Sequence, residues 1–235
     1  MTKTSTCKNE VELKFYSFVK RSLDIIVAFL GIVILFPIFL IISIAIKIDS
    51  KGPVIFSQQR FGINKTTFNI YKFRTMDILA PRNVATKDLG ESSKYITKLG
   101  SILRKTSLDE LPQLINILIG QMSIVGPRPV ILEEYDLIAE REKYGANSVR
   151  PGLTGWAQVN GRDELDNETK ARYDGEYVEK FGFFMDLKCF FRTVFLVFSK
   201  EGVVEGSDIS ENNLEEKTIE IKNISSKYKH KREIN

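Results

Sequence analysis

The sequence predicts an α+β protein that is mainly helical, with an apolar membrane segment near the N-terminus and a small domain after it. Three observations predict this class. Residues 25–46 form a run of 22 residues without a charge. Residues 68–73 alternate along the chain in the way that is typical of a strand. Residues 111–118 and 183–198 repeat their apolar side chains every three or four positions, which is the spacing of amphipathic helices.

The apolar run is long enough to cross a membrane, since a helix of this length measures about 33 Å. Pro37 lies in its middle, where proline kinks or breaks a helix. Both flanks are basic, and basic flanks tend to stay in the cytoplasm. A re-entrant helix–break–helix that enters and leaves by one face satisfies both observations, and a kinked spanning helix is the alternative. The basic residues are Lys14, Lys20 and Arg21 before the run, and Lys47, Lys51, Arg60 and Lys65 after it.

We divide the chain into four parts. Residues 1–13 are polar and are expected to be mobile, and residues 14–48 form the re-entrant membrane anchor. Residues 49–202 form a domain on the cytoplasmic side. Residues 203–235 are rich in Glu, Lys, Asn and Ser and are expected to be a disordered tail. At the start of the run, Asp24 is expected to pair with Arg21 or a later basic residue.

The domain begins with a short β-hairpin. Gly52-Pro53 indicates a turn before a strand at 54–56, and a second strand at 68–73 follows a turn at 62–65. Residues 80–98 are expected to form a surface loop. Helices are expected from Ser107 to Gly120, at 131–143 and at 170–180. The aromatic stretch 181–198 contains too many charges to span a membrane, so we expect an amphipathic helix that lies in the membrane interface; a core helix is the alternative.

Composition excludes several kinds of function. The net charge of +4 does not indicate a nucleic-acid-binding surface. The single histidine, His230, lies in the basic C-terminal stretch, so a histidine general base or a histidine metal site is practically excluded. Two cysteines argue against a disulfide-based fold. Catalysis would therefore depend on carboxylates, arginines and lysines.

The adjacent carboxylates of Asp109 and Glu110 lie between Arg104 and the turn that contains Arg128. A carboxylate beside guanidinium groups suits chemistry on phosphate, because arginine binds phosphate through two parallel hydrogen bonds and a carboxylate can attack phosphorus or bind a divalent cation. The alternatives are a surface helix start and a capping box formed by Ser107 with Glu110. A position at a helix N-terminus predicts that the pKa of both carboxyls is lowered.

A glycine-rich loop follows at 150–162, bounded by Arg150 and Arg162. Its glycines favour a close approach of backbone segments, and its arginines either contact a nucleotide or hold the loop. Trp156 either stacks or anchors at lipid headgroups, or packs in the core. Asp174 belongs either to a metal site or to a salt bridge.

Together these motifs resemble the bacterial sugar transferases, the monotopic polyprenyl-phosphate phosphoglycosyl transferases, from about Lys20 to Gly202, in the small, minimal form of that family. The chain departs from the family at Phe36, where serine is common before the central proline. The matching segments are Lys20-Arg21-x-x-Asp24, Gly52-Pro53-Val54-Ile55-Phe56-x-Gln58-x-Arg60-x-Gly62, Tyr71-Lys72-Phe73-Arg74-Thr75-Met76, Arg104-x-x-Ser107-Leu108-Asp109-Glu110-Leu111-Pro112-Gln113, Met122-Ser123-x-Val125-Gly126-Pro127-Arg128-Pro129, Arg150-Pro151-Gly152-x-Thr154-Gly155-Trp156-Ala157-Gln158-Val159-Asn160-Gly161-Arg162, Asp174-x-x-Tyr177-Val178 and Asp186-Leu187-Lys188.

The resemblance implies transfer of a sugar-1-phosphate from a UDP-sugar to polyprenyl (undecaprenyl) phosphate, with release of UMP, at the start of surface glycan synthesis. It implies that Asp109 is the nucleophile and forms a phosphoryl-Asp intermediate, and that Glu110 binds Mg²⁺. By motif match Arg104 and Arg128 contact substrate phosphate, and we add Lys72 and Arg74. The resemblance also implies the re-entrant anchor broken at Pro37.

The expected location is the bacterial inner membrane, with the catalytic domain on its cytoplasmic face. Two other functions compete: a single-pass membrane protein that binds partners, and another membrane enzyme acting on lipid phosphates. No residue distinguishes which sugar is transferred, and the sequence is silent on the oligomeric state.

Overall fold

The computed structural model describes residues 3–81, 92–161 and 165–199. It is mostly helical, with two small sheets of two strands each. The expected disordered tail, residues 203–235, lies outside the described residues. The described helices are α1 (Lys3–Asp49), α2 (Lys98–Lys105), α3 (Gln113–Leu118), α4 (Tyr135–Lys143), α5 (Asn167–Glu179) and α6 (Phe183–Ser199).

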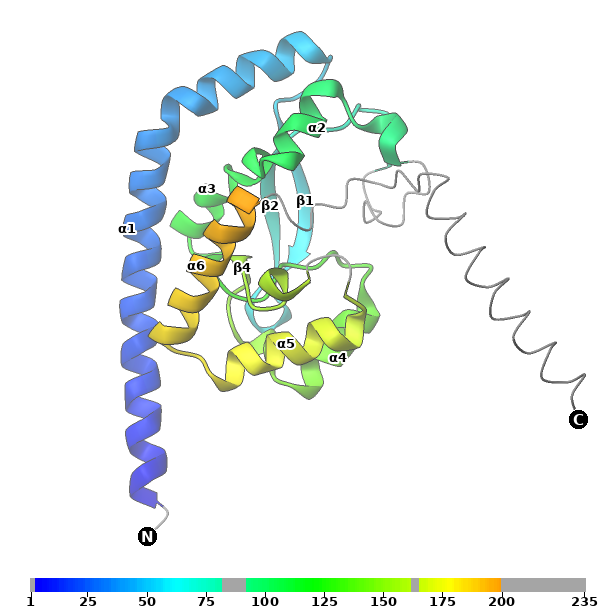
Figure 1. Ribbon diagram of the computed structural model, residues 1–235. Coiled ribbons are helices and arrows are strands. Elements are labelled where there is room, and N and C mark those ends of the chain that lie inside the picture. The colour runs from blue at the N-terminus through cyan, green and yellow to red at the C-terminus, as the bar shows by residue number, and fades with distance from the viewer. Residues whose placement is uncertain (1–2, 82–91, 162–164, 200–235) are drawn as a thin grey trace, which may run out of the picture.

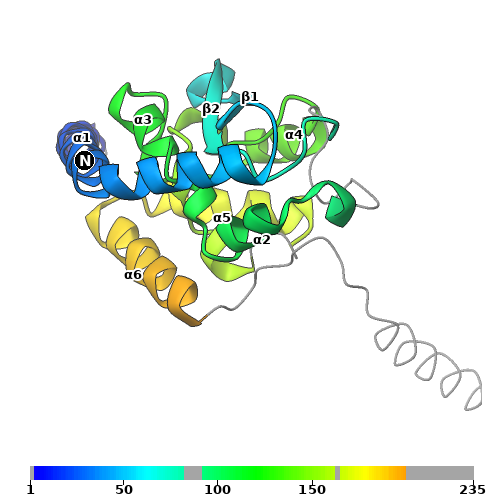
Figure 2. The same ribbon diagram turned by 90° about the horizontal axis from the view of Figure 1, so that it is seen from above.

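Helix α1 contains the whole apolar run and Pro37. It is long and apolar enough to cross a membrane, judged by length and composition alone. The helix bends sharply in its second half, and Figure 2 shows this half lying across the fold, with the hairpin on one side and α6 on the other. Proline inside a helix is a common cause of such a bend. The expected non-helical break is absent from the described chain, because α1 remains helical through Pro37. Residues 3–13 are its first turns, and their mobility stays a prediction.

The predicted hairpin is confirmed. Strands β1 (Ile55–Phe61) and β2 (Thr67–Phe73) pair antiparallel, with Ile55 opposite Phe73. The turn between them is a short 3₁₀ segment in which Asn64 has a positive φ of 52°. Phe68 and Ile70 of β2 are buried against α1 and α3, together with Ala28, Leu114, Ile117 and Met122. The hairpin therefore packs on α1 together with α3.

A second core joins α5 and α6 to the short parallel pair β3 (Ser123–Val125) and β4 (Gly152–Thr154). The glycine-rich loop makes the expected close approach. A Cβ at Gly155 would lie 2.1 Å from the carbonyl oxygen of Gly126, and a Cβ at Gly152 would lie 2.1 Å from the amide nitrogen of Gly126. Only glycine at these positions lets the loop lie against the turn that carries Arg128.

Polar contacts fix α1 to the domain. Arg21 donates to the carbonyl oxygens of Ile117 and Leu118, at 2.7 and 3.0 Å, and so caps the C-terminus of α3. Asp24 is buried and accepts a hydrogen bond from the amide of Ile124 at 3.0 Å. It also acts electrostatically on Arg21, one of the basic residues expected beside it.

Asp186 of α6 forms the third connection. It accepts hydrogen bonds from the hydroxyls of Tyr16 and Tyr177, at 2.6 and 2.7 Å, and pairs with Lys20. Tyr16 and Lys20 lie on α1 and Tyr177 lies on α5, so one carboxylate joins three helices.

Candidate active site

The acidic pair lies in a 3₁₀ turn, η4 (Leu108–Glu110), between α2 and α3. The predicted continuous helix from Ser107 is therefore wrong, since α3 begins only at Gln113. The capping box is also wrong, because Ser107 has a left-handed conformation (φ 56°) and its side chain makes no cap. Glu110 is consequently not engaged in capping and turns toward cationic side chains.

Glu110 receives two cations on one oxygen. Lys72 Nζ lies 2.6 Å from Glu110 Oε1, and Arg128 Nη2 lies 3.2 Å from the same atom. Lys72 comes from β2, and Arg128 comes from the turn between β3 and α4. Burial by itself raises the pKa of Glu110, but Lys72 and Arg128 outweigh it and lower this pKa to about 2. Glu110 is therefore ionised at neutral pH.

Asp109 has a different environment. Its side chain is buried, and burial raises its pKa. Lys72 opposes this shift, whereas the neighbouring charge of Glu110 raises the pKa further. The expectation that both carboxyls have a lowered pKa is thus wrong for Asp109; for Glu110 the direction agrees, but the cause is Lys72 and Arg128 and not a helix N-terminus. Arg104 and Arg128 also act electrostatically on Asp109. The fold thereby brings together five of the predicted site residues, which we call the acidic-pair cluster: Lys72, Arg104, Asp109, Glu110 and Arg128.

Arg104 and Arg60 support this cluster from two sides. Arg104 Nε donates to Thr75 Oγ1 at 2.9 Å, so it connects α2 to the end of the hairpin. Arg60 donates to Gln58 Oε1 at 2.7 Å and approaches the carbonyl of Pro129, beside Arg128, at 3.4 Å. Burial, reinforced by Arg128, lowers the pKa of Arg60 to about 10. We did not select Arg60 as a site residue, although the Gln58-x-Arg60 spacing places both side chains on one face of β1.

Arg74 does not join the cluster. Its guanidinium donates to the carbonyl oxygen of Ser50 at 2.7 Å, to Ser50 Oγ at 2.9 Å and to the carbonyl of Lys51. These groups directly follow α1, so Arg74 satisfies carbonyls at the C-terminal end of this helix. The predicted phosphate contact by Arg74 is not supported by this placement.

Asp174 forms the salt bridge that was the alternative to a metal site. It is fully buried, and Arg141 Nη2 and Nε lie 2.6 and 2.8 Å from Asp174 Oδ2. Burial raises the pKa of Asp174, and Arg141 opposes this shift. Arg141 also donates to the carbonyl of Arg128 at 2.9 Å. The pair thus holds the backbone of the turn that presents Arg128 to Glu110.

The remaining predicted residues lie elsewhere. Arg150 Nε donates to the carbonyl of Gly120 at 3.1 Å, and Arg162 lies outside the described residues. Trp156 is buried and packs in the core, which was the alternative to a position at the lipid headgroups. Its Nε1 donates to Glu176 at 2.8 Å, and Lys188 Nζ lies 4.5 Å from its ring centroid.

The acidic-pair cluster meets the modest requirements of Mg²⁺. This ion commonly takes one or two carboxylates and completes its shell with water and substrate phosphates. Glu110 supplies a carboxylate that stays ionised, and Asp109 adjoins it. Across residues 3–81, 92–161 and 165–199, no three His, Cys, Asp or Glu side chains gather into a metal-binding group. Substrate phosphates would therefore have to supply further ligands.

Comparison with known proteins identifies the family. The family model described as "Bacterial sugar transferase" matches residues 15–200. The UDP-glucose:undecaprenyl-phosphate glucose-1-phosphate transferase of Escherichia coli is 41% identical over 184 residues, which cover 75% of this chain and 39% of that protein. The UDP-N-acetylgalactosamine-undecaprenyl-phosphate N-acetylgalactosaminephosphotransferase of Aeromonas hydrophila is 36% identical over 185 residues, 76% of this chain and 43% of its own length.

A shorter relative matches over most of its length. The exopolysaccharide production protein ExoY of Sinorhizobium fredii is 37% identical over 189 residues, which cover 74% of this chain and 83% of that protein. The first relatives, in contrast, are matched over only about two fifths of their length. Because the family model covers most of α1, the acidic-pair cluster and α6 in one match, the chain belongs to the bacterial sugar transferase family.

Proposed function

We propose that this protein transfers a sugar-1-phosphate from a UDP-sugar to undecaprenyl phosphate, giving the polyprenyl-diphosphate sugar and UMP. The observation that carries the proposal is the acidic-pair cluster: a buried carboxylate, Asp109, beside an ionised carboxylate held by Lys72 and Arg128. Sugar nucleotides and lipid phosphates are both anions, and such a set of cations offsets the charge of two phosphates near one carboxylate. The relatives from Escherichia coli and Aeromonas hydrophila are named as transferases that act on these substrate classes.

The reaction proceeds in two displacements. An oxygen of Asp109 attacks the phosphorus that bears the sugar, the bond from this phosphorus to the bridging oxygen breaks, and UMP leaves with that oxygen. The phosphoryl-Asp109 that forms still bears the sugar. An oxygen of undecaprenyl phosphate then attacks the same phosphorus, and the Asp109 carboxylate is released unchanged.

The residues of the acidic-pair cluster and the two arginines that support it have separate roles in these steps. Burial leaves the Asp109 carboxylate poorly solvated, which favours attack because little water has to be displaced. Arg128, with Lys72 and Arg104 near it, stabilises negative charge on the transferred phosphoryl group. When bound at Glu110, Mg²⁺ would neutralise the diphosphate so that a carboxylate can approach it. Arg60 and Arg141 position the turn that carries Arg128.

The membrane part of the proposal rests on α1 and α6. We propose that α1 enters and leaves by the cytoplasmic face of the inner membrane, bent near Pro37, with the catalytic domain in the cytoplasm. The basic flanks and the bend of α1 support this arrangement. In α6 an exposed apolar face consists of Phe183, Phe184, Phe190, Phe191 and Phe195, which suits a helix lying at the level of the headgroups. A lipid-bound acceptor and a water-soluble donor would meet at this level.

The test is an assay of UMP release. Purified protein is incubated with Mg²⁺, undecaprenyl phosphate and a panel of UDP-sugars. We expect wild type to release UMP with at least one UDP-sugar and Asp109→Asn to release none. When the acceptor is omitted, mass spectrometry should find a sugar-phosphate adduct on Asp109. Near-normal turnover by Asp109→Asn would contradict the covalent mechanism. Release of inorganic phosphate from the lipid without UMP would instead indicate a lipid phosphatase.

A further inference from the structure

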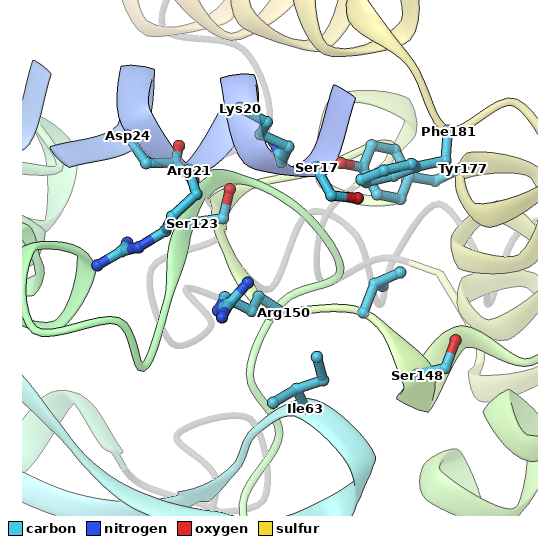
Figure 3. A pocket seen from close by; sticks show the side chains of 11 residues that line it. Ser17, Lys20, Arg21, Asp24, Ile63, Ser123, Ser148, Arg150, Tyr177 and Phe181 are labelled. Carbon is cyan, nitrogen blue, oxygen red and sulfur yellow. The ribbon is translucent and has the colours of Figure 1, made fainter. Parts of the chain in front are cut away.

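A second cationic site lies between α1 and the rest of the fold. A cavity of about 130 Å³ is lined on one side by α1 and on the other by β3 and the segment that leads into β4 (Figure 3). Three of its lining residues are basic and one is acidic: Lys20, Arg21, Arg150 and Asp24. Asp24 accepts from the Ile124 amide, and Lys20 is paired with Asp186. Asp24 also acts electrostatically on Arg21, so the three basic and two acidic side chains leave a net positive charge, which lies at the two arginines.

Gly120 brings these arginines together. Arg150 Nε donates to its carbonyl oxygen at 3.1 Å, and Arg21 Nη2 would lie 3.3 Å from a Cβ at this glycine. Gly120 has a φ of +95°, which other residues rarely adopt. The positive charges of Arg21 and Arg150 repel each other. An anion between them would convert this repulsion into two attractive contacts.

Ser123 supplies an independent sign of a ligand. Its side chain lines the cavity, its residue is only 1% exposed, and its Oγ has no hydrogen-bond partner among the described residues. Figure 3 shows this hydroxyl directed toward α1. A buried hydroxyl without a partner is costly, so the absence of a protein acceptor indicates that something else satisfies it.

The cavity is separate from the acidic-pair cluster. Ile63, in the turn of the hairpin, lines the cavity, whereas Lys72 reaches Glu110 from the far end of β2. The five steps from Thr67 to Lys72 along this strand span about 17 Å. A group held at Arg150 therefore cannot react at Asp109.

We propose that this cavity binds a phosphate-bearing anion, held by Arg21 and Arg150 and accepting a hydrogen bond from Ser123 Oγ. Arginine forks and a serine hydroxyl are a common donor set for phosphate oxygens. A cavity of this volume holds several waters, each of which takes about 30 Å³ in the liquid, and a phosphate group has only five heavy atoms. The site does not depend on the proposed reaction, whereas its lipid source rests on the proposed membrane placement of α1.

The position of the cavity along α1 favours the headgroup of an anionic phospholipid as the source of this phosphate. Arg21 and Asp24 directly precede the uncharged run 25–46, where a membrane helix leaves the hydrocarbon. Free phosphate offers the same chemistry, so the experiment has one arm for each source.

The experiment uses the full chain in nanodiscs and measures its thermal unfolding midpoint. In the first arm, inorganic phosphate is added to phosphatidylcholine nanodiscs at constant ionic strength. In the second, phosphatidylglycerol is mixed into the nanodiscs. Wild type is compared with Arg150→Gln and Ser123→Ala. Lys143→Gln, which neutralises an exposed lysine on α4 outside the cavity, is the matched control.

We expect the midpoint to rise with phosphatidylglycerol in wild type and Lys143→Gln, and apparent affinity to fall about ten-fold in Arg150→Gln and Ser123→Ala. Without an anion, Ser123→Ala should be at least as stable as wild type, because it removes an unsatisfied hydroxyl. A rise with inorganic phosphate as well would identify a site for phosphate in general. An equal response by all four proteins, or no response by wild type in either arm, would overturn the proposal.

Discussion

Glu110→Gln and Asp109→Asn should change the stability of the protein in opposite directions, although the two residues are neighbours. Each substitution replaces a carboxylate by an amide of nearly the same shape. Lys72 and Arg128 lower the pKa of Glu110 from 4.5 to about 2, so the fold favours the ionised form of this residue. Burial raises the pKa of Asp109, so the fold disfavours its ionised form. At pH 7 one charge stabilises the folded state and the other destabilises it.

The magnitude for Glu110 follows from its pKa. A fall from 4.5 to about 2 corresponds to about 3 kcal/mol of folding free energy. The Glu110 side chain is 17% exposed, so solvent screens this interaction only in part. For a chain of this length we expect Glu110→Gln to lower the unfolding midpoint by about 6–12 °C. Asp109→Asn should raise the midpoint.

The pH dependence provides a second measurement. The stabilisation from Glu110 is fully present above its unfolded pKa near 4.5 and is lost as the pH falls toward 2. The difference between wild type and Glu110→Gln should therefore be constant from pH 7 to about pH 5.5 and shrink below pH 4.5. For Asp109 the sign is reversed: the advantage of Asp109→Asn should be largest at neutral pH and vanish below 3.8, the ordinary pKa of this group.

Differential scanning fluorimetry in detergent, from pH 7 to pH 3, measures both effects. Glu179→Gln serves as the control, since Glu179 is exposed at the end of α5 and should change stability by less than about 0.5 kcal/mol. If Glu110→Gln and Asp109→Asn shift the midpoint in the same direction by similar amounts, the electrostatic difference between the two carboxylates is refuted.

Three further substitutions test the buried ion pair, the glycine-rich loop and α6. Asp174→Asn leaves Arg141 buried without its counter-charge and should cost about 3–5 kcal/mol, measured by thermal unfolding; a loss below about 1 kcal/mol would show that the pair is not sequestered from water. Gly155→Ala places a methyl group 2.1 Å from the Gly126 carbonyl, so it should lower both the midpoint and UMP release, whereas Gly145→Ala meets no atom within 4 Å and should lose no more than the cost of its positive φ. Phe191→Asp on the exposed face of α6 should weaken binding to vesicles without lowering the midpoint in detergent, and unchanged vesicle binding would contradict the interfacial placement of α6.

Local patterns predicted the parts of the fold that depend on local interactions. The alternation at 68–73 and the glycine turn at 62–65 predicted the hairpin, because strand pairing across a short turn needs no distant partner. The same holds for the close approach of the glycine-rich loop, since its glycines leave room for a backbone. The predicted helix from Ser107 is wrong, because Ser107 adopts a left-handed conformation that interrupts the helix. The helix propensity of the residues does not predict this conformation.

The fate of each charged residue depended on tertiary partners. We predicted phosphate contacts for both Arg74 and Arg128. In the structure Arg74 donates to carbonyls that directly follow α1, whereas Arg128 forms an ion pair with Glu110. Asp174 had two open interpretations, and only the packing of α4 on α5 placed Arg141 beside it. A charged residue in a motif therefore indicates what kind of interaction is available. The tertiary fold determines whether that residue binds a backbone group, another side chain or a substrate.

The acidic pair illustrates how one short turn gives two adjacent carboxylates separate environments. In a 3₁₀ segment successive side chains point about 120° apart. Asp109 therefore turns into the interior while Glu110 faces Lys72 of β2 and Arg128 of the next turn. A carboxylate held by two cations stays ionised, which suits metal binding, and a buried carboxylate is poorly solvated, which suits attack on phosphorus. The division of roles proposed for the two residues thus follows from the direction in which each side chain points, since their chemistry is otherwise the same.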